Sequence, residues 1–286
     1  MTAQILDGRA LARAIRREIA DEVVQFQDKN GWAPSIAVVQ VGEDPASSWY
    51  VRQIKKSFER AGMGFALHTL DENVQADALA QLLCTLNTDP RTSGIIVQLP
   101  LPKHLSQRLV TDLLDPAKDV DGIHPLNAGR LLQGDSDTFA PATPAGGMEI
   151  ISRYGIDLKG KEAVMVGRSN IVGRPMALLM LHQHATVTIC HSRTRDLAAV
   201  TRRADILVAA VGKPNIITAD MVRPGAVVID FGVNVVGDKL IGDVDTEGVA
   251  EVAGYITPVP GGTGPMTNAM LMRNTLIAAQ RQLEQA

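Results

Sequence analysis

The chain has 286 residues, of which 45% are hydrophobic and 21% charged, so it is long enough for two globular domains of ordinary size. Its net charge of −3 gives no general attraction to nucleic acid or to an anionic membrane surface, and no apolar run approaches the length of a transmembrane helix. With only two cysteines, no apolar leader and no metal-type spacing of its six histidines, we expect a cytoplasmic protein without a metal.

The first half of the sequence alternates between helical and strand-like segments. Helices are predicted at 11–27, 49–60 and 76–86, and strands at 35–41, 64–70 and 94–97. Such alternation favours parallel strands joined by right-handed crossovers, and ligands of these sheets gather beyond the carboxyl ends of the strands. Residues 42–50 and 98–102 are therefore expected to lie beside one site.

Two segments rich in proline and glycine, 116–127 and 141–147, interrupt this alternation and predict a domain boundary near residue 140. Strands are predicted after it at 163–166, 186–190, 206–210 and 226–230. The expected fold class is α/β, with an N-terminal α/β substrate domain, a C-terminal Rossmann-type dinucleotide-binding domain and a cleft between them. We assign residues 1–140 to the first domain, 141–265 to the second, and 266–286 to a last helix that packs back on the first.

The segment AVMVGRSNIVGRP, residues 163–175, predicts a strand, a glycine turn and the start of a helix, which together can bind a phosphate. Gly167 can take the tight turn, Gly173 lets the helix approach the sheet, and Pro175 is tolerated early in the helix. Ser169 stands where the dinucleotide fingerprint has its second glycine, so this pattern alone is a weak signal.

The next strand ends without the carboxylate that NAD-binding units use to bind the ribose 2′-hydroxyl. Ser192 and Arg193, together with Arg168, instead offer donors that suit a 2′-phosphate, so we predict NADP as the cofactor. The alternative is that these are ordinary surface loop residues. The predicted cofactor-binding residues are Gly167, Arg168, Ser169, Ile171, Val172, Gly173, Pro175, His191, Ser192, Arg193, Thr194, Val211, Gly212 and Thr267.

Candidate catalytic side chains follow the strands of the first half. Tyr50 and Ile54 are four residues apart and share one helix face. Gln98 follows another strand, and Asp121 lies in a DVDG loop. Taken alone, Asp119 and Asp121 could simply form a turn.

Six motifs, spread over nearly the whole chain, resemble the methylenetetrahydrofolate dehydrogenase/cyclohydrolase family. They are VGEDPASSWYV (41–51), IIVQLPLP (95–102), KDVDG (118–122), PATP (141–144), VGRSNIVGRP (166–175) and PGGTGPMT (260–267). The resemblance implies a homodimer that binds NADP and a tetrahydrofolate substrate, with the folate in the interdomain cleft. It implies that Tyr50 stacks on the folate, that Asp121 hydrogen-bonds the aminopyrimidine edge of the pterin, and that Arg168 and Ser192 contact the 2′-phosphate.

The same resemblance implies a set of substrate-binding residues: Tyr50, Ile54, Gln98, Leu99, Pro100, Asp121, Pro260, Gly261, Gly262 and Thr263. Tyr50, Gln98 and Asp121 are the catalytic candidates, with Lys56 a weaker one. The chain departs from the family pattern at Ile54, where the catalytic lysine is expected four residues after the tyrosine. Thr263 also replaces a usual valine, and Ala142 stands where cysteine is common.

An isoleucine at position 54 affects the two family activities differently. Oxidation of 5,10-methylenetetrahydrofolate moves a hydride and needs no proton removed from the reacting carbon. Hydrolysis of the methenyl cation needs a positioned acid–base group, which isoleucine lacks. We therefore predict an NADP-dependent dehydrogenase with weak or absent cyclohydrolase activity. The alternatives are a bifunctional enzyme in which Lys56 or a water replaces the lysine, another dehydrogenase such as shikimate dehydrogenase, and a non-catalytic NADP-binding paralogue.

Overall fold

The computed structural model describes residues 2–284, which form two compact units. Of the described residues, 14–142 and 268–284 make up the three-stranded unit, and 2–13 and 143–267 make up the six-stranded unit. The sequence predicts that residues 2–13 belong to the first domain, but in the structure they belong to the six-stranded unit. The reason is that β1 (Gln4–Ile5) pairs in parallel with β11 (Tyr255–Ile256), and a strand of two residues has no periodicity to detect in the sequence.

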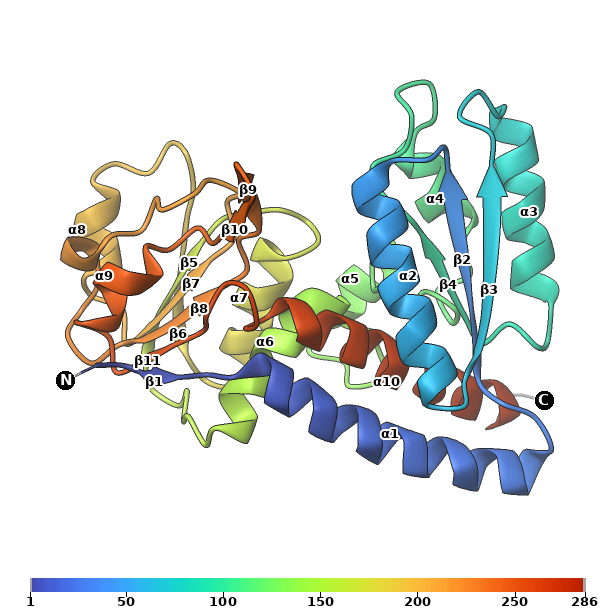
Figure 1. Cartoon of the computed structure of the whole chain (residues 1–286), viewed down its shortest axis with the longest axis horizontal. Helices are drawn as coiled ribbons and strands as arrows, with labels where there is room; N and C mark the ends of the chain where they lie inside the picture. Colours follow the sequence, from blue (N-terminus) through green and yellow to red (C-terminus); the bar gives the residue numbers. More distant parts are fainter. Residues whose placement is uncertain (1, 285–286) are drawn as a thin grey trace. The chain divides into compact units, whose positions relative to one another are not determined.

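The sheet of the three-stranded unit has the order β3-β2-β4, and both pairings are parallel. Its strands are β2 (Ser35–Val41), β3 (Gly64–Leu70) and β4 (Gly94–Val97), which have the predicted bounds. The helices outside the six-stranded sheet and its crossovers are α1 (Gly8–Asn30), α2 (Pro45–Arg60), α3 (Ala76–Thr88), α4 (Gln107–Leu113), α5 (Pro125–Gln133) and α10 (Gly264–Glu284) (Figure 1). Leu79 and Leu83 of α3 pack on the sheet face that Val39 and Val97 form.

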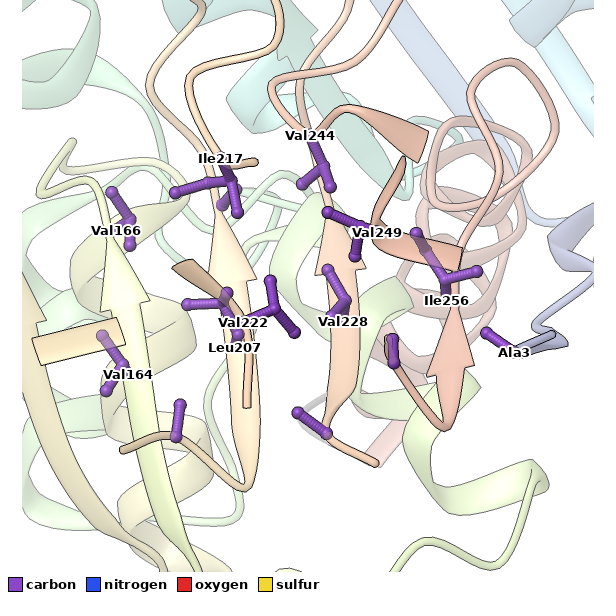
Figure 2. Close-up of a cluster of buried hydrophobic side chains, with 14 of the residues drawn as sticks. Ala3, Val164, Val166, Leu207, Ile217, Val222, Val228, Val244, Val249 and Ile256 are labelled. Atoms are coloured by element: carbon purple, nitrogen blue, oxygen red, sulfur yellow. The ribbon is translucent and has the colours of Figure 1, made fainter. Parts of the chain in front are cut away.

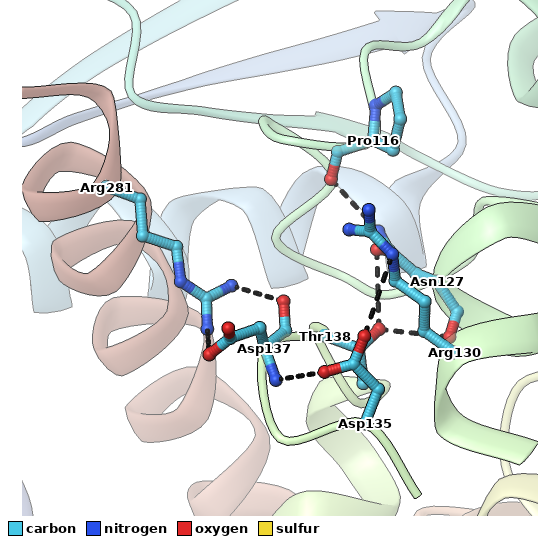
Figure 3. A network of polar contacts seen from close by, with 7 residues as sticks. All are labelled: Pro116, Asn127, Arg130, Asp135, Asp137, Thr138 and Arg281. Atoms are coloured by element: carbon cyan, nitrogen blue, oxygen red, sulfur yellow. Dashed lines mark hydrogen bonds and ion pairs between the residues drawn. The ribbon is translucent and has the colours of Figure 1, made fainter. Parts of the chain in front are cut away.

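Polar contacts within the three-stranded unit fix the loop that follows α5 (Figure 3). Arg281 of α10 donates to the carbonyl of Asp137 at 2.9 Å, and Arg130 of α5 lies 3.9 Å from the carboxylate of Asp135. Asn127 donates its amide to the carbonyl of Pro116 at 3.0 Å. These contacts join the loop after α5 to α10 and to α5, and α5 to the loop that precedes it.

The sheet of the six-stranded unit is parallel throughout, in the order β1-β11-β8-β7-β5-β6. Its remaining elements are β5 (Glu162–Val166), β6 (Thr186–Cys190), β7 (Ile206–Ala209), β8 (Val227–Asp230), α6 (Ala142–Arg153), α7 (Gly173–His182), α8 (Leu197–Thr201), a 3₁₀ turn at Ala219–Met221 and α9 (Thr246–Ala250). Side chains of β5, β7, β8 and β11 form an apolar cluster (Figure 2). Because β6 and β7 lie on opposite sides of β5, the strand order reverses between β5 and β7.

A two-stranded hairpin also occurs in this unit and was not predicted. It consists of β9 (Asn234–Val236) and β10 (Lys239–Ile241), which pair antiparallel around Gly237. Gly237 has φ +60°, as a tight hairpin turn requires. Within residues 2–284, no helix is both long and apolar enough to cross a membrane.

Candidate active site

Gln98 and Asp121 lie at the same edge of the three-stranded sheet. The backbone N–H of Gln98 donates to the carbonyl of Val39 at 2.8 Å, so the pairing of β2 with β4 continues past Val97. An isolated parallel bridge between Ile95 and Asp119 pairs the start of the DVDG loop with β4, and the chain turns directly after it, at Asp121. Leu99 and Pro100 continue from Gln98 at this edge, as the carboxyl-end rule predicts.

The two aspartates of the DVDG loop have different surroundings. Asp119 is fully buried, and its carboxylate accepts from the N–H groups of Ile123 and His124 and from the amide of Asn127. Asp119 therefore shapes the turn. Asp121 is only half-buried and accepts from the N–H of Ala142, so part of its carboxylate is available to a ligand.

Burial raises the pKa of Asp121 to about 7, and the negative charge of Asp119 acts in the same direction. Burial also raises the pKa of Tyr50 above its ordinary value of 10, and the charge of Asp121 contributes. This effect of the Asp121 charge on Tyr50 indicates that the two side chains lie close together. The Tyr50 hydroxyl remains protonated at neutral pH.

The start of α2 explains how Tyr50 is positioned. Asp44 caps the helix by accepting from the N–H of Ser47 at 2.8 Å, and a proline stands in the first turn. The buried Gln40 donates its amide to the hydroxyl of Ser48 at 2.9 Å, which joins the end of β2 to the helix. Tyr50 follows within the first two turns.

No lysine occupies the buried face of α2. Ile54, four residues after Tyr50, is fully buried, whereas Lys55 and Lys56 are exposed. Lys55 forms an ion pair with Glu59 at 3.8 Å. Lys118 is a buried lysine near the site that was not predicted, and its Nζ donates to the carbonyls of Leu86 and Asp89.

Residues 260–263, predicted to bind substrate, form a glycine loop in the six-stranded unit. Gly261 has φ +115°, and its carbonyl accepts from the N–H of Arg9 at 3.0 Å. Gly262 donates to the carbonyl of Pro258, leaving no room there for a side chain. The hydroxyl of Thr263, which is buried, donates to the carbonyl of Asp230 at 2.8 Å. This bond explains why threonine is accommodated where valine is usual.

The carboxyl end of β5 forms the glycine cradle that the sequence predicts. Gly167 has φ +129°, and a Cβ there would collide with the carbonyl of Ala210. A Cβ on Gly173 would lie 2.5 Å from the carbonyl oxygen of Gly167, so the helix start packs directly on the turn. Ser169 accepts from the N–H groups of Val172 and Gly173 at 3.2 Å. A hydroxyl cap thus stands where the fingerprint has glycine, and Ile171 and Pro175 complete this segment.

The loop after β6 leaves the sheet beside this cradle, since Gly167 donates to the carbonyl of Cys190 at 2.9 Å. The loop is closed on itself: the N–H of His191 donates to the hydroxyl of Thr194 at 2.8 Å, and the N–H of Arg193 to Nδ1 of His191. The side chains of Ser192 and Arg193 are exposed, as is that of Arg168. Cationic and hydroxyl donors, with no carboxylate in residues 191–195, fit a dinucleotide that carries a 2′-phosphate.

The other predicted cofactor residues are Val211, Gly212 and Thr267. Val211 and Gly212 follow β7, at the point where the strand order reverses. The hydroxyl of Thr267 lies 3.3 Å from that of Thr143. Two fully buried aspartates behind this turn, Asp230 and Asp243, were not predicted as site residues. Their signal was an acidic residue at the end of an apolar strand and another directly after a glycine.

Among the described residues, no group of three histidine, cysteine, aspartate or glutamate side chains is arranged to hold a metal ion.

Residues 6–121 match the model of the tetrahydrofolate dehydrogenase/cyclohydrolase catalytic domain, and residues 141–283 match the NAD(P)-binding domain of the same family. The chain belongs to the tetrahydrofolate dehydrogenase/cyclohydrolase family. The family assignment and the two-domain α/β fold predicted from the sequence are confirmed.

Individual members of the tetrahydrofolate dehydrogenase/cyclohydrolase family resemble the chain over its full length. The bifunctional protein FolD of Roseiflexus castenholzii is 56% identical over 283 residues, which cover 99% of this chain and 98% of that protein. The crystal structure of the bifunctional enzyme of Campylobacter jejuni has a TM-score of 0.96 at 45% identity and covers 98% of this chain and 99% of its own. The Trypanosoma brucei enzyme, complexed with NADP cofactor and inhibitor, has a TM-score of 0.96 at 35% identity and covers 99% of both chains.

Proposed function

We propose that this protein is an NADP-dependent methylenetetrahydrofolate dehydrogenase whose cyclohydrolase activity is weak or absent. The observation that carries the proposal is the fully buried Ile54, on the same helix face as Tyr50 and at the position of the family lysine. The family membership and the glycine cradle after β5 support the dehydrogenase, and Ile54 restricts the hydrolysis.

For the oxidation, the chain has to bind and orient its ligands. The Asp121 carboxylate, when ionised, accepts hydrogen bonds from the aminopyrimidine edge of the pterin, and the Tyr50 ring stacks on the folate. The amide of Gln98, at the same sheet edge, orients the reacting part. Gly167, Gly173, Arg168 and Ser192 hold NADP, which when bound supplies the nicotinamide that accepts the hydride. None of these residues has to remove a proton from the reacting carbon.

Hydrolysis of the methenyl cation requires more, because the attacking water must lose a proton. The Tyr50 hydroxyl has a pKa raised above 10 and is a poor base at neutral pH. Asp121 has a pKa of about 7, but in this proposal its carboxylate is engaged with the pterin. Lys118 donates to backbone carbonyls, and Lys56 is exposed. Among these side chains, none is left to take the proton.

The relatives named bifunctional favour a second candidate, in which hydrolysis survives through Lys56 or an ordered water. A single-cuvette assay separates the two by following NADPH formation and methenyltetrahydrofolate absorbance together. We expect NADPH to form while the methenyl product accumulates and decays no faster than in buffer. Enzyme-dependent decay would refute the restricted activity. If Lys56→Ala then abolishes that decay, Lys56 is the acid–base group, and if not, the step belongs to a water or another side chain.

We also propose a homodimer in the cytoplasm. The β9–β10 hairpin supports the dimer, because Val235, Val236 and Leu240 on its strands and Val233 directly before it are 44–74% exposed. Contiguous exposed apolar side chains of this kind mark association surfaces. The two cysteines are both free, which agrees with a reducing compartment.

A further inference from the structure

The turn that follows β7 occupies a special place in the six-stranded unit. It begins at Ala210, whose N–H donates to the carbonyl of Val166 at 2.8 Å, and it passes beside the Gly167 turn. The strand order reverses between β5 and β7, and dinucleotides bind at such a reversal. The conformation of residues 211–213 therefore determines one wall of the proposed cofactor site.

A single carboxylate holds this turn. The N–H groups of Val211 and Gly212 donate to Oδ2 of Asp243 at 2.6 and 3.0 Å, and the N–H of Lys213 donates to Oδ1 at 2.8 Å. A fourth donor, the amide of Asn234, reaches Oδ1 at 3.0 Å. Gly212 has φ +65°, and successive N–H groups around such a residue form a concave anion-binding nest. Here the anion is a side chain of the protein itself, fully buried.

Asp243 is in turn fixed by Asp230. The N–H of Asp243 donates to Oδ1 of Asp230 at 3.2 Å, and the N–H of Val244 donates to Oδ2 at 2.9 Å. A Cβ on Gly232 or on Gly242 would collide with these carboxylates, so both glycines leave the space that the two aspartates fill. Asp243 is therefore held rigidly in a packed interior, as a residue that positions another must be.

The direction of the peptide groups links this nest to the ligand. In a trans peptide, the N–H and the preceding C=O point in opposite directions. Because the N–H groups of 211–213 point toward Asp243, the carbonyls of Ala210, Val211 and Gly212 point away from it. The carbonyl of Ala210 indeed faces Gly167. Within residues 2–284, no backbone N–H donates to the carbonyls of Val211 or Gly212.

We propose that Asp243 is a positioning residue for the cofactor: by binding the N–H groups of 211–213, it aims the carbonyls of Val211 and Gly212 at hydrogen-bond donors of the bound dinucleotide. Carbonyl oxygens accept hydrogen bonds, so their partners are the ribose hydroxyls or the carboxamide, and not the phosphates. This inference rests on the proposed NADP-dependent function.

The test compares Asp243→Asn with Asp245→Asn in the full-length protein. Asparagine keeps the shape of Asp243 but turns an NH₂ group toward backbone donors, so the turn loses part of its support. Asp245 is a matched control because it also accepts a backbone N–H, that of Gly248, but caps α9 and does not bind the turn. Gly212→Ala is a second variant, which keeps Asp243 and strains the turn at its positive φ.

For Asp243→Asn, we expect the Kd for NADP, measured by calorimetry, and the KM for NADP to rise at least tenfold, with the KM for methylenetetrahydrofolate within twofold of the unmodified protein. Gly212→Ala should show the same pattern, and Asp245→Asn should leave all three constants unchanged. An Asp243→Asn protein that is less stable but binds NADP with unchanged affinity would overturn the inference, and so would an equal rise in both KM values. If Asp243→Asn does not fold, an unchanged NADP affinity in Gly212→Ala overturns it. Failure of the unmodified protein to bind NADP would instead refute the proposed function.

Discussion

Asp121 should reduce the stability of the folded protein at neutral pH, and its replacement by asparagine should increase it. Burial and the nearby Asp119 raise the pKa of Asp121 from 3.8 to about 7 in the folded chain. Below pH 3.8 the carboxyl group is protonated in the folded and unfolded states, so ionisation has no effect on stability. Between pH 3.8 and about 7 the unfolded chain ionises first, which favours unfolding, and above pH 7 the difference is constant.

The size of this effect follows from the two pKa values. One pKa unit corresponds to 1.36 kcal/mol, so the difference between 3.8 and about 7 gives an upper limit of about 4 kcal/mol above pH 7. Asp121 is half-buried and partly screened by solvent, so we expect about 2 kcal/mol. Asp121→Asn should remove this cost, because a neutral amide has no ionisation to disfavour.

Urea unfolding at about pH 4.5 and about pH 8 measures the effect, since the linkage predicts a small difference between variant and unmodified protein at the lower pH and the full gain at the higher. Asp112→Asn is the control, because Asp112 is an exposed aspartate in an i,i+4 ion pair with Arg108. The same Asp121→Asn protein should bind folate at least tenfold more weakly and NADP normally, because one acceptor oxygen for the pterin is lost. Loss of stability at both pH values with normal folate binding would show that Asp121 only shapes the turn.

Three further substitutions test other parts of the proposal. The unmodified protein should prefer NADP over NAD at least tenfold in kcat/KM. Arg168→Ala should cost about 1–3 kcal/mol of binding free energy for NADP and little for NAD. An equal loss for both cofactors would show that Arg168 does not bind the 2′-phosphate. Ile54→Lys should create or raise methenyltetrahydrofolate hydrolysis in the spectrophotometric assay, because burial lowers the pKa of the new amine. The same substitution should destabilise the protein by about 3 kcal/mol, because it buries an amine. Ile54→Met keeps the side chain apolar and should have neither effect. Val235→Asp should shift the protein toward monomers in sedimentation velocity, whereas Val24→Asp, on the exposed face of α1, should not, and a dimer unaffected by Val235→Asp would exclude the hairpin as its interface.

The buried parallel strands could be predicted from the sequence with their bounds because they are short, continuous apolar runs. SIAVVQV and GIIV are too short for typical buried helices, so a buried strand is the structure that they predict. The structure buries nearly every residue in them. The hairpin at 234–241 was missed for the opposite reason. Its strands have three residues each and are largely exposed, so they lack the apolar pattern on which the other predictions rest.

Proline explains the missed helix α5. Pro116 and Pro125 both predict a break in secondary structure, but Pro125 stands in the first turn of a helix, where its missing N–H has no cost. His124 caps this helix through Nδ1, and Gly134 ends it with φ +76°. The sequence thus contains a signal for each end of α5, His124 at its start and Gly134 at its end. Because histidine is an unusual helix cap, the prolines and glycines of this region favoured a loop.

Some residues of the candidate site could likewise be predicted from the sequence, and others could not. Gln98 and Asp121 could be predicted to lie together, because the carboxyl ends of parallel strands share one edge, and the structure places both there. The role of Asp243 could not, because its partners are three backbone N–H groups about thirty residues earlier, and a backbone N–H has no signature in sequence. The contact therefore requires the carboxylate of Asp243 and the positive φ of Gly212. The donor of residue 213 is its backbone N–H, which is present whatever its side chain. Lys213→Ala should consequently leave NADP affinity within about twofold, in contrast to Asp243→Asn, because it removes a side chain and keeps the hydrogen bond that holds the turn.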